Sequence, residues 1–321
     1  MEALRELRVL TARHAESGQA GPVVEAGEVT SSENHALGLK FAVARRPSEP
    51  QHHVYEPVFN LVVQGEKRAV LGGNVFPCRA GHFLVASVDL PMTIHLAGVS
   101  RERPFMGLGI KLTPAKVAAL LVETTVAEDL PIEPSGLGVS DASTELLDAV
   151  LRFVRLIDQP VDLPVLAPLA EREILWRLLR SEQGRRVRQI GLADSRLSQV
   201  GRAMRWMREH YARRMRMEEL ARVAGMSVTS FHRHFRAVAL MSPLQYMKQI
   251  RLQEARARLL AGSEDVTTVG LAVGYDSPSQ FSREYKRAYG SPPGQDARFL
   301  RASSRGNGAG SSTSVLAHAS K

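Results

Sequence analysis

The sequence predicts an α+β protein of two domains, in which a β-rich N-terminal domain precedes an all-α C-terminal domain. A length of 321 residues favours two domains over one. The hydrophobic period changes from two to about 3.6 after Thr113-Pro114, which indicates that strands give way to helices there. A motif in the last third of the chain recurs after fifty residues, which indicates a duplicated helical unit.

The composition is that of a globular protein and excludes several other classes. Hydrophobic residues make up 44% of the chain and charged residues 23%, unlike a disordered, collagen-like or disulfide-scaffold chain. The single cysteine, Cys78, excludes an intramolecular disulfide and a CxxC zinc or redox pair. No run of ~18 uncharged apolar residues exists, and the first residues scatter Glu, Arg and His where a signal peptide needs an apolar stretch. We therefore expect a soluble, cytoplasmic protein with no membrane partner.

Short β-branched or aromatic runs bounded by Gly, Pro and Asn predict about seven strands in the N-terminal half. They lie at residues 37–45, 58–63, 68–71, 75–76, 82–88, 92–96 and 105–111. The triplet Gly72-Gly73-Asn74 predicts a hairpin between two of these strands. A spacing of roughly ten residues favours a small barrel or sandwich over a parallel sheet.

A small barrel has an interior that can hold a ligand. Four polar side chains of the strand region are candidates to converge there: Tyr55, Asn60, Gln64 and His82. We therefore expect a small-molecule site confined to residues 35–112. The alternative is a filled barrel that serves only as a dimerisation scaffold.

Apolar residues at helical spacing, such as Leu147, Val150 and Val154, predict three helices after the strands. The helices lie at residues 115–128, 141–158 and 165–182. We expect their apolar stripe to pack under the barrel. The alternative is that the stripe forms a dimer interface between two chains.

Composition also predicts where the domains end. A polar, glycine-bearing and basic stretch begins at Gln183, and a Ser/Gly-rich stretch follows Arg301. We therefore expect a sensor or dimerisation domain with a helical extension at residues 1–183 and a linker at 184–195. An all-α DNA-binding domain follows at residues 196–301, and a disordered tail at 302–321.

Positive charge is concentrated in one segment. Residues 1–195 hold 21 Lys and Arg against 24 Asp and Glu, whereas residues 196–301 hold 19 against 9. A basic third joined to a near-neutral body is typical of a nucleic-acid-binding module. A basic surface that only keeps the protein soluble is the alternative.

The repeated motif predicts two helix-turn-helix units. Ser227-x3-Phe231-x3-Phe235 returns as Ser277-x3-Phe281-x3-Tyr285. Each copy follows a short helix and a glycine, which permits the positive φ of a tight turn. The serine then caps the second helix, and the aromatic pair packs that helix onto the first.

The opposite face of each second helix stays free and carries short polar and basic side chains. These residues are Thr229, His232, Arg233 and Arg236 on the first such helix, and Ser279, Gln280, Arg283 and Arg287 on the second. Such side chains suit a helix lying in the major groove, where arginine reaches guanine and glutamine pairs with adenine. One uninterrupted helix at residues 243–261 joins the units and spans ~25 to 28 Å. Successive major grooves are ~34 Å apart, so we expect a modest DNA bend.

The pattern from Leu220 to Pro293 resembles the AraC/XylS family of bacterial transcription regulators. Its most specific part is Gly274-Tyr-x-Ser-x3-Phe281-Ser-Arg-x-Tyr-Lys-Arg-x-Tyr-Gly290-x-x-Pro. In the N-terminal half, Tyr55-x-Pro-x3-Leu-Val-x-Gln64-Gly looks like the cupin-type sensor domain of one branch of that family. The resemblance implies a cupin-like β-barrel followed by two helix-turn-helix units, and it carries base-facing roles to Thr229, His232 and Arg233, and to Ser279, Gln280 and Arg283.

The resemblance also implies a function. We expect a sequence-specific DNA-binding transcription regulator whose partners are double-stranded promoter DNA and a small-molecule effector. RNA polymerase and a second copy of the chain are further candidate partners. The alternative is a cupin-type enzyme with a nucleic-acid-binding appendage, but the sequence contains no Gly-x-Ser-x-Gly, Walker or dinucleotide-binding motif.

Two residues depart from the family pattern. Leu240 stands where a glycine usually ends the first recognition helix, so that helix must close at a cost of about 1 kcal/mol. Gly270 stands where alanine is usual inside a helix, a loss of similar size. We expect both departures to affect stability more than DNA recognition.

Two further hypotheses concern the strand region. His52 and His53 would point to opposite faces of a strand, so they could not serve one metal ion, and we expect neither a metal nor another cofactor. Arg79 could activate Cys78 as a redox or electrophile sensor. A buried, inert thiol is the alternative that we favour.

Overall fold

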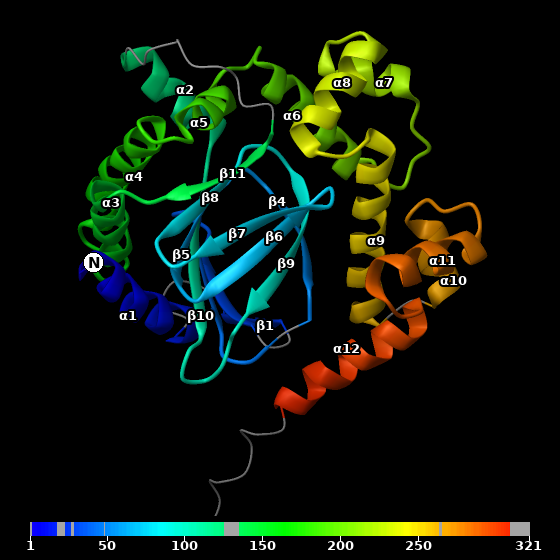
Figure 1. The fold of residues 1–321 in the computed structure, drawn as a ribbon, viewed down its shortest axis with the longest axis horizontal. Coiled ribbons are helices and arrows are strands. Elements are labelled where there is room, and N and C mark those ends of the chain that lie inside the picture. Colours follow the sequence, from blue (N-terminus) through cyan, green and yellow to red (C-terminus); the bar gives the residue numbers. More distant parts are fainter. Residues whose placement is uncertain are drawn as a thin grey trace, which may run out of the picture. The chain divides into compact units, whose positions relative to one another are not determined.

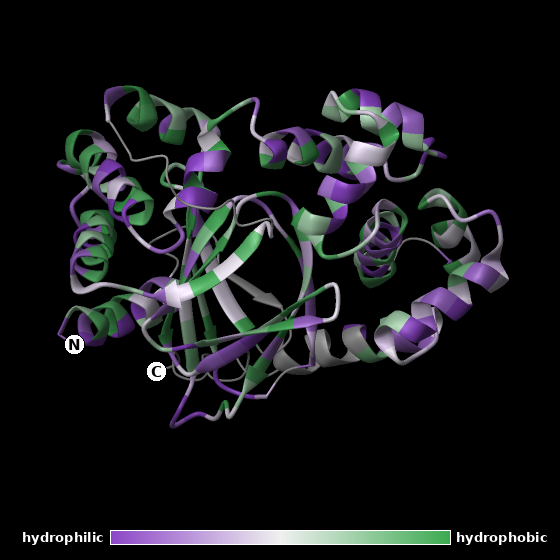
Figure 2. Ribbon diagram, turned by 45° about the horizontal axis from the view of Figure 1, so that its top comes forward, coloured by the Kyte–Doolittle hydropathy of each residue, from purple (hydrophilic) through white to green (hydrophobic). Residues whose placement is uncertain are grey.

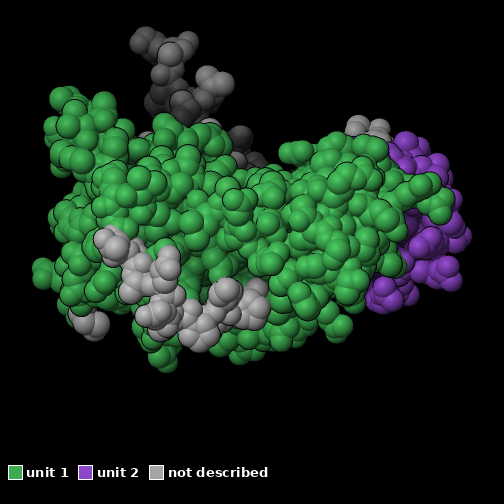
Figure 3. All heavy atoms as spheres, turned by 90° about the horizontal axis from the view of Figure 1, so that it is seen from above, with its two compact units in different colours: residues 1–250 green, residues 251–321 purple. Residues whose placement is uncertain are grey.

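The computed structural model describes residues 2–17, 23–26, 29–47, 49–124, 135–262 and 265–308. The chain divides into two compact units, Met1–Ile250 and Arg251–Lys321, shown in two colours in Figure 3. The first unit contains the strands and the first helix-turn-helix pair, and the second contains the other pair. The division therefore falls eight residues into the long helix predicted at 243–261, not at the expected linker.

Two antiparallel sheets form the β-rich part of the first unit (Figure 1). One has seven strands in the order β1-β2-β3-β10-β5-β8-β11, and the other has four in the order β4-β9-β6-β7. The strands are β1 (Val23–Ala26), β2 (Val29–Asn34), β3 (Leu39–Ala44), β4 (Gln51–Tyr55), β5 (Val58–Gln64), β6 (Glu66–Leu71), β7 (Asn74–Arg79), β8 (His82–Ala86), β9 (Leu90–Ala97), β10 (Phe105–Lys111) and β11 (Leu137–Asp141). All seven predicted strands are present. The predicted hairpin is confirmed as a two-residue turn at Gly72 and Gly73, which both have positive φ.

Helices flank the strands and make up the rest of the described chain. In the first unit they are α1 (Glu2–Ser17), α2 (Pro114–Glu123), α3 (Thr144–Arg155), a 3-10 turn (Leu156–Asp158), α4 (Leu163–Leu179), α5 (Gly184–Gly191), α6 (Arg196–Glu209), α7 (Met217–Ala224) and α8 (Val228–Ala239). Helix α9 (Pro243–Ala261) follows, and then α10 (Val266–Ala272), α11 (Pro278–Tyr289) and α12 (Pro293–Gly308). Many of these helices carry hydrophobic and hydrophilic residues on different sides (Figure 2), as helices that cover a core must.

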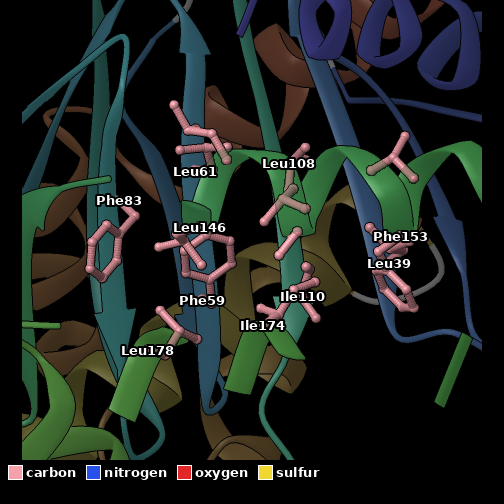
Figure 4. Close-up of a cluster of buried hydrophobic side chains, with 14 of the residues drawn as sticks. Leu39, Phe59, Leu61, Phe83, Leu108, Ile110, Leu146, Phe153, Ile174 and Leu178 are labelled. Atoms are coloured by element: carbon pink, nitrogen blue, oxygen red, sulfur yellow. The ribbon is translucent and has the colours of Figure 1, made fainter. Parts of the chain in front are cut away.

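One core lies between the seven-stranded sheet and the helices. Alternate residues of β5, β8 and β10, such as Phe59, Phe83 and Ile110, face Phe153 of α3 and Leu178 of α4 (Figure 4). All five side chains are almost fully buried. The amphipathic stripe of the predicted helices thus packs on the sheet, as we favoured, and pairing of two chains is not needed to bury it.

A second core continues from the space between the sheets into the first helix-turn-helix pair. It joins Leu71, Leu84 and Met92 of the strands to Phe235 and Tyr246 of the helices. Because the first pair shares this core with the strands, the two form one compact unit. The predicted boundary at 195/196 therefore does not separate two independent cores.

Several elements lie outside the sequence predictions. Helix α1 and strands β1, β2, β4 and β11 were not predicted. The expected linker contains α5, where Val187 and Ile190 are buried and the Arg186 guanidinium donates to the carbonyl oxygen of Ser135 at 2.9 Å. Helix α12 continues seven residues into the segment for which we expected disorder, and residues 309–321 lie outside the described part. Residues 125–128 of the helix predicted at 115–128 also lie outside it. Among the described helices, none is long and apolar enough to cross a bilayer.

Candidate nucleic-acid interface and effector site

Both predicted helix-turn-helix units are present with the local chemistry that the sequence indicated. Ser227 and Ser277 cap α8 and α11, because each hydroxyl accepts a hydrogen bond from the backbone N–H three residues later. Gly225, before α8, has φ of 69° and allows the tight turn after α7. The aromatic pairs also pack as expected, with ring centroids 5.4 Å apart for Phe231 and Phe235.

The predicted outward stripes are exposed on both second helices. The exposed residues are Thr229, His232, Arg233 and Arg236 of α8, and Ser279, Gln280, Arg283 and Arg287 of α11. Burial and the neighbouring Arg233 lower the pKa of His234, which lies beside the stripe, so this ring stays neutral near pH 7. The structure thus leaves two polar faces free for a groove, and base contact by these residues stays a prediction.

One carboxylate borders the second stripe. The Gln280 amide nitrogen donates to one oxygen of Glu284 at 3.3 Å, and the Tyr275 hydroxyl donates to the other at 3.0 Å. These bonds fix the carboxylate next to an amide that would pair with a base. We infer that Glu284 orients Gln280, a role that the sequence did not reveal because it depends on Tyr275 from the preceding turn.

The two departures from the family pattern have clear structural consequences. Leu240 has φ of 57° and is the single non-glycine residue with positive φ in the described chain. The strain predicted at the end of α8 is therefore present. Gly270 differs from the expectation, because a Cβ built there would lie 2.8 Å from Cδ1 of the buried Phe281. The glycine allows α10 and α11 to pack closely, so alanine would not simply strengthen the helix.

Two of the four candidate effector residues meet inside the sheets, around a residue that we did not predict. The Lys67 ammonium donates a hydrogen bond to Oδ1 of Asn60 and lies 5.9 Å from the centre of the Tyr55 ring. Only 3% of Lys67 is exposed, and no carboxylate pairs with it among the described residues. Burial lowers the pKa of Lys67 to about 8 and raises that of Tyr55 to about 12. The alternation of β6 could have revealed Lys67, because it is in phase with the buried Ala69 and Leu71.

The other two candidates are partnered elsewhere. Gln64 donates to the carbonyl oxygen of Pro104 at 2.9 Å and accepts from Arg8 at 3.2 Å. The His82 ring lies at the start of β8, 2.7 Å from Nε of Arg79 and 3.1 Å from Asp141. Contacts among the described residues therefore link the first two candidates, Tyr55 and Asn60, through Lys67, and a pocket shared by all four residues stays a prediction.

The structure favours the inert alternative for the cysteine. Cys78 is 1% exposed and directly opposite Lys67 in the β6–β7 ladder. Burial raises the pKa of the Cys78 thiol, and Lys67 opposes this only in part. In the part of the chain that the structure describes, no three His, Cys, Asp or Glu side chains are grouped as metal ligands would be.

Polar contacts fasten the first helix-turn-helix pair to the strands. Arg208 of α6 donates to Glu56 at 2.6 Å and to the buried Asp89 at 2.9 Å. The Tyr246 hydroxyl of α9 donates to the carbonyl oxygen of Asp89 at 2.9 Å. Burial raises the pKa of Asp89, although Arg208 opposes this. Because Asp89 is buried and Arg208 is its hydrogen-bonded cation, loss of Arg208 would destabilise the contact between α6 and the strands.

A backbone link joins the end of the first recognition helix to the strands. The Gly136 N–H donates to the carbonyl oxygen of Val238 near the end of α8, and the Gly136 carbonyl accepts from the Ser87 N–H, both at 2.9 Å. Gly136 thus connects the segment after β8 with α8, within the same unit.

Comparisons with known proteins agree with this architecture. Residues 36–186 match the family described as AraC-type transcriptional regulator N-terminus, and residues 220–298 match the family described as helix-turn-helix domain. The chain belongs to the AraC/XylS family. The expected fold class, a β-sheet N-terminal domain followed by an all-α domain, is confirmed.

Two transcription regulators are among the relatives of this chain. The virulence regulon transcriptional activator VirF of Yersinia enterocolitica is 27% identical over 178 residues, which are 54% of this chain and 63% of VirF. The HTH-type transcriptional regulator ExsA of Pseudomonas aeruginosa is 26% identical over 155 residues, 48% of this chain and 55% of ExsA. The chain therefore spans less than two thirds of the length of these curated relatives. A crystal structure of ToxT from Vibrio cholerae matches with a TM-score of 0.51 and 10% identity, over 82% of this chain and 98% of ToxT, a likeness of fold.

Proposed function

We propose that this protein is a sequence-specific DNA-binding transcription regulator. The observation that carries the proposal is the pair of capped helices, α8 and α11, whose exposed stripes present arginines and short polar donors. Each helix is held by an aromatic pair on its inner face, so its outer face is presented rigidly. The relatives VirF and ExsA are described as transcription regulators, which supports the same conclusion.

The proposal assigns base readout to Arg233 and Arg283. Both lie within the first two turns of their helices and are exposed, and neither pairs with a carboxylate among the described residues. Loss of one bidentate arginine–guanine contact costs about 1–3 kcal/mol of discrimination. Arg236 and Arg287 lie further along the same stripes, where attraction to phosphates is their role.

The test is selection of binding sites from random duplex DNA by the full chain, followed by titration of the selected site at fixed salt. We expect Arg233→Ala to relax preference in one half of the site and Arg283→Ala in the other. Arg214→Ala, at an exposed position between α6 and α7, is the matched control and leaves preference unchanged. If all three variants weakened DNA binding equally on every sequence, these arginines would contact phosphates alone.

We further propose that a small-molecule effector binds between the sheets, near Lys67, Asn60 and Tyr55. A buried ammonium without a carboxylate partner is costly, and an anionic group on a ligand would offset that cost. Structures of ToxT are described as bound to an unsaturated fatty acid and to (E)-4-(8-methylnaphthalen-1-yl)but-3-enoic acid, which are both carboxylic acids. The effector site thus remains within residues 35–112, but around Lys67 instead of Gln64 and His82.

Binding of hexanoate, octanoate and decanoate to the full chain, measured by calorimetry, tests the effector site. We expect Lys67→Met to weaken the tightest of these acids at least ~10-fold, because the charged hydrogen bond is lost. Lys40→Met, at an exposed position of β3, is the control. Equal affinity for the wild type and Lys67→Met would exclude Lys67 as the anion partner.

A further inference from the structure

A cavity of about 310 Å³ lies in the first unit, outside the sheets. Its walls come from the segment after β8, from the start of α2, from the end of α5 and from α6. Successive contacts link α2 to α5 and α5 to α6, which follow one another along the upper part of Figure 1. Residues of the sensor part and of the first helix of the DNA-binding part therefore line this open cavity together.

The cavity has an apolar body. Val88, Ile190 and Leu197 line it, and Leu197 is 2% exposed. A Cβ built at Gly201 would lie 2.9 Å from Val88, so the glycine keeps the α6 wall close to the strands there. Apolar walls with a few polar groups are typical of sites for small organic molecules.

One side of the cavity carries two arginines that form no ion pair with a carboxylate among the described residues. Arg202, Arg205 and Arg208 follow at intervals of three residues along α6, and the first two line the cavity. Arg208 is neutralised by Glu56 and Asp89. Arg202 donates to the carbonyl oxygen of Ala193 at 2.8 Å, and this neutral acceptor does not compensate the guanidinium charge.

Arg205 is the freer of the two. It is exposed and forms no hydrogen bond or ion pair with any described residue, and Asp89, an acid that acts on it electrostatically, is already paired with Arg208. The start of α2 adds to the positive potential, because Pro114 and Ala115 line the cavity and the Thr113 side chain does not cap the helix. Three sources of positive potential thus surround one apolar cavity.

We propose that this cavity binds a compact organic anion, with a carboxylate or similar group at Arg205 and Arg202 and an aromatic or branched apolar body against Val88, Ile190 and Leu197. Its volume is at the lower end of the range for small-ligand sites, about 300–1,000 Å³, which favours a ring-sized body over a long chain. The site is separate from the effector site proposed at Lys67, since none of Tyr55, Asn60 or Lys67 lines it.

A ligand here would contact the strands and α6 at once. Because α6 and α8 share one core with the strands, such a ligand stabilises the arrangement in which the first helix-turn-helix pair is packed on them. The site therefore offers a second regulatory input that acts on α6 directly.

Benzoate, benzyl alcohol and inorganic phosphate are the probes, and calorimetry with the full chain is the measurement. We expect benzoate to bind at least ~10-fold more tightly than either other probe, because only benzoate has both the charge and the apolar body. Arg205→Gln should weaken benzoate ~10-fold, and Ala115→Leu, at an exposed position on the cavity edge, should weaken it by obstruction. Arg5→Gln, an exposed arginine of α1, is the matched control.

Three results would overturn the proposal. Phosphate binding as tightly as benzoate would show a bare anion site, and benzyl alcohol binding as tightly would show that charge is irrelevant. Benzoate affinity that survives both Arg205→Gln and Ala115→Leu but is lost in Lys67→Met would place the ligand between the sheets. That last result would support the effector site near Lys67 while excluding this one, so the two proposals fail separately.

Discussion

Replacement of Gly72 by alanine tests whether the first recognition helix depends on its contact with the strands. Gly72 has φ of 58°, and a Cβ built there would lie 2.8 Å from the carbonyl carbon of Leu240, at the end of α8, and closer still to its carbonyl oxygen. Gly73 is the matched control. It follows in the same turn, has φ of 86°, and a Cβ built there would meet nothing within 4 Å.

The two variants share one cost and differ in another. Alanine at either position adopts the left-handed conformation at about 1 kcal/mol. Only Gly72→Ala also forces a methyl group into the backbone of Leu240, and such overpacking costs about 1–3 kcal/mol more. We therefore expect the free energy of unfolding of the first unit to fall by about 1 kcal/mol for Gly73→Ala and about 2–4 kcal/mol for Gly72→Ala.

Urea unfolding of the full chain gives the two free energies, and amide hydrogen exchange locates the effect. The Gly136 N–H, which donates to Val238 in α8, should exchange faster in Gly72→Ala than in the wild type, since the end of α8 must move away. It should stay protected in Gly73→Ala. Equal destabilisation by both variants, with Gly136 equally protected, would refute the idea that this contact holds α8.

Three further changes have expected outcomes. Lys67→Met should raise the free energy of unfolding at pH 7, because the folded pKa of Lys67, about 8, lies below the ordinary 10.5 and the buried charge therefore opposes folding. As the pH rises between these two values, the wild type should become more stable. Thermal unfolding from pH 7 to 10 should show that rise in the wild type but not in the variant. Gly270→Ala should lower stability by up to ~2 kcal/mol in urea unfolding, since overpacking against Phe281 outweighs the gain of about 1 kcal/mol in helix propensity, and a more stable variant would contradict the close packing of α10 and α11. Arg208→Gln removes the hydrogen-bonded cationic partner of the buried Asp89 and should cost about 1–3 kcal/mol at pH 7. This difference should shrink on acidification, once Asp89 is protonated.

Features with local causes were predictable from the sequence. A serine cap, a glycine turn and an aromatic pair at a spacing of four all act within one helix and its neighbour, so Ser227, Gly225 and Phe231 revealed their roles by position alone. The strands with a clear alternation were found for the same reason. Helix α1 was not among the predicted elements, although Ala3, Leu7 and Leu10 are spaced as on a helix face.

Features that depend on partners far along the chain were not predictable. Strand β11 has five residues, and it pairs with β8, from which β9, β10 and α2 separate it along the chain. Helix α5 was not predicted within the expected linker, because Arg186 looks solvent-exposed by type, whereas the structure buries it against Ser135. Gln64 and His82 were proposed for the barrel interior on residue type, and their actual partners, Pro104 and Arg79, lie at strand ends.

Leu240 shows how a departure from the family pattern follows from contact between the parts of the first unit. The turn after α8 requires a positive φ, which glycine adopts freely and leucine adopts at about 1 kcal/mol. Yet the Leu240 side chain packs against the core that the helices share with the strands, and its Cβ approaches the turn at Gly72. A half-buried leucine recovers about 1 kcal/mol or more through that burial, so strain and packing nearly cancel. Position 240 thus tolerates a leucine, whereas position 72 in the strand turn requires a glycine. The close approach of the Leu240 carbonyl leaves no room for a side chain at position 72.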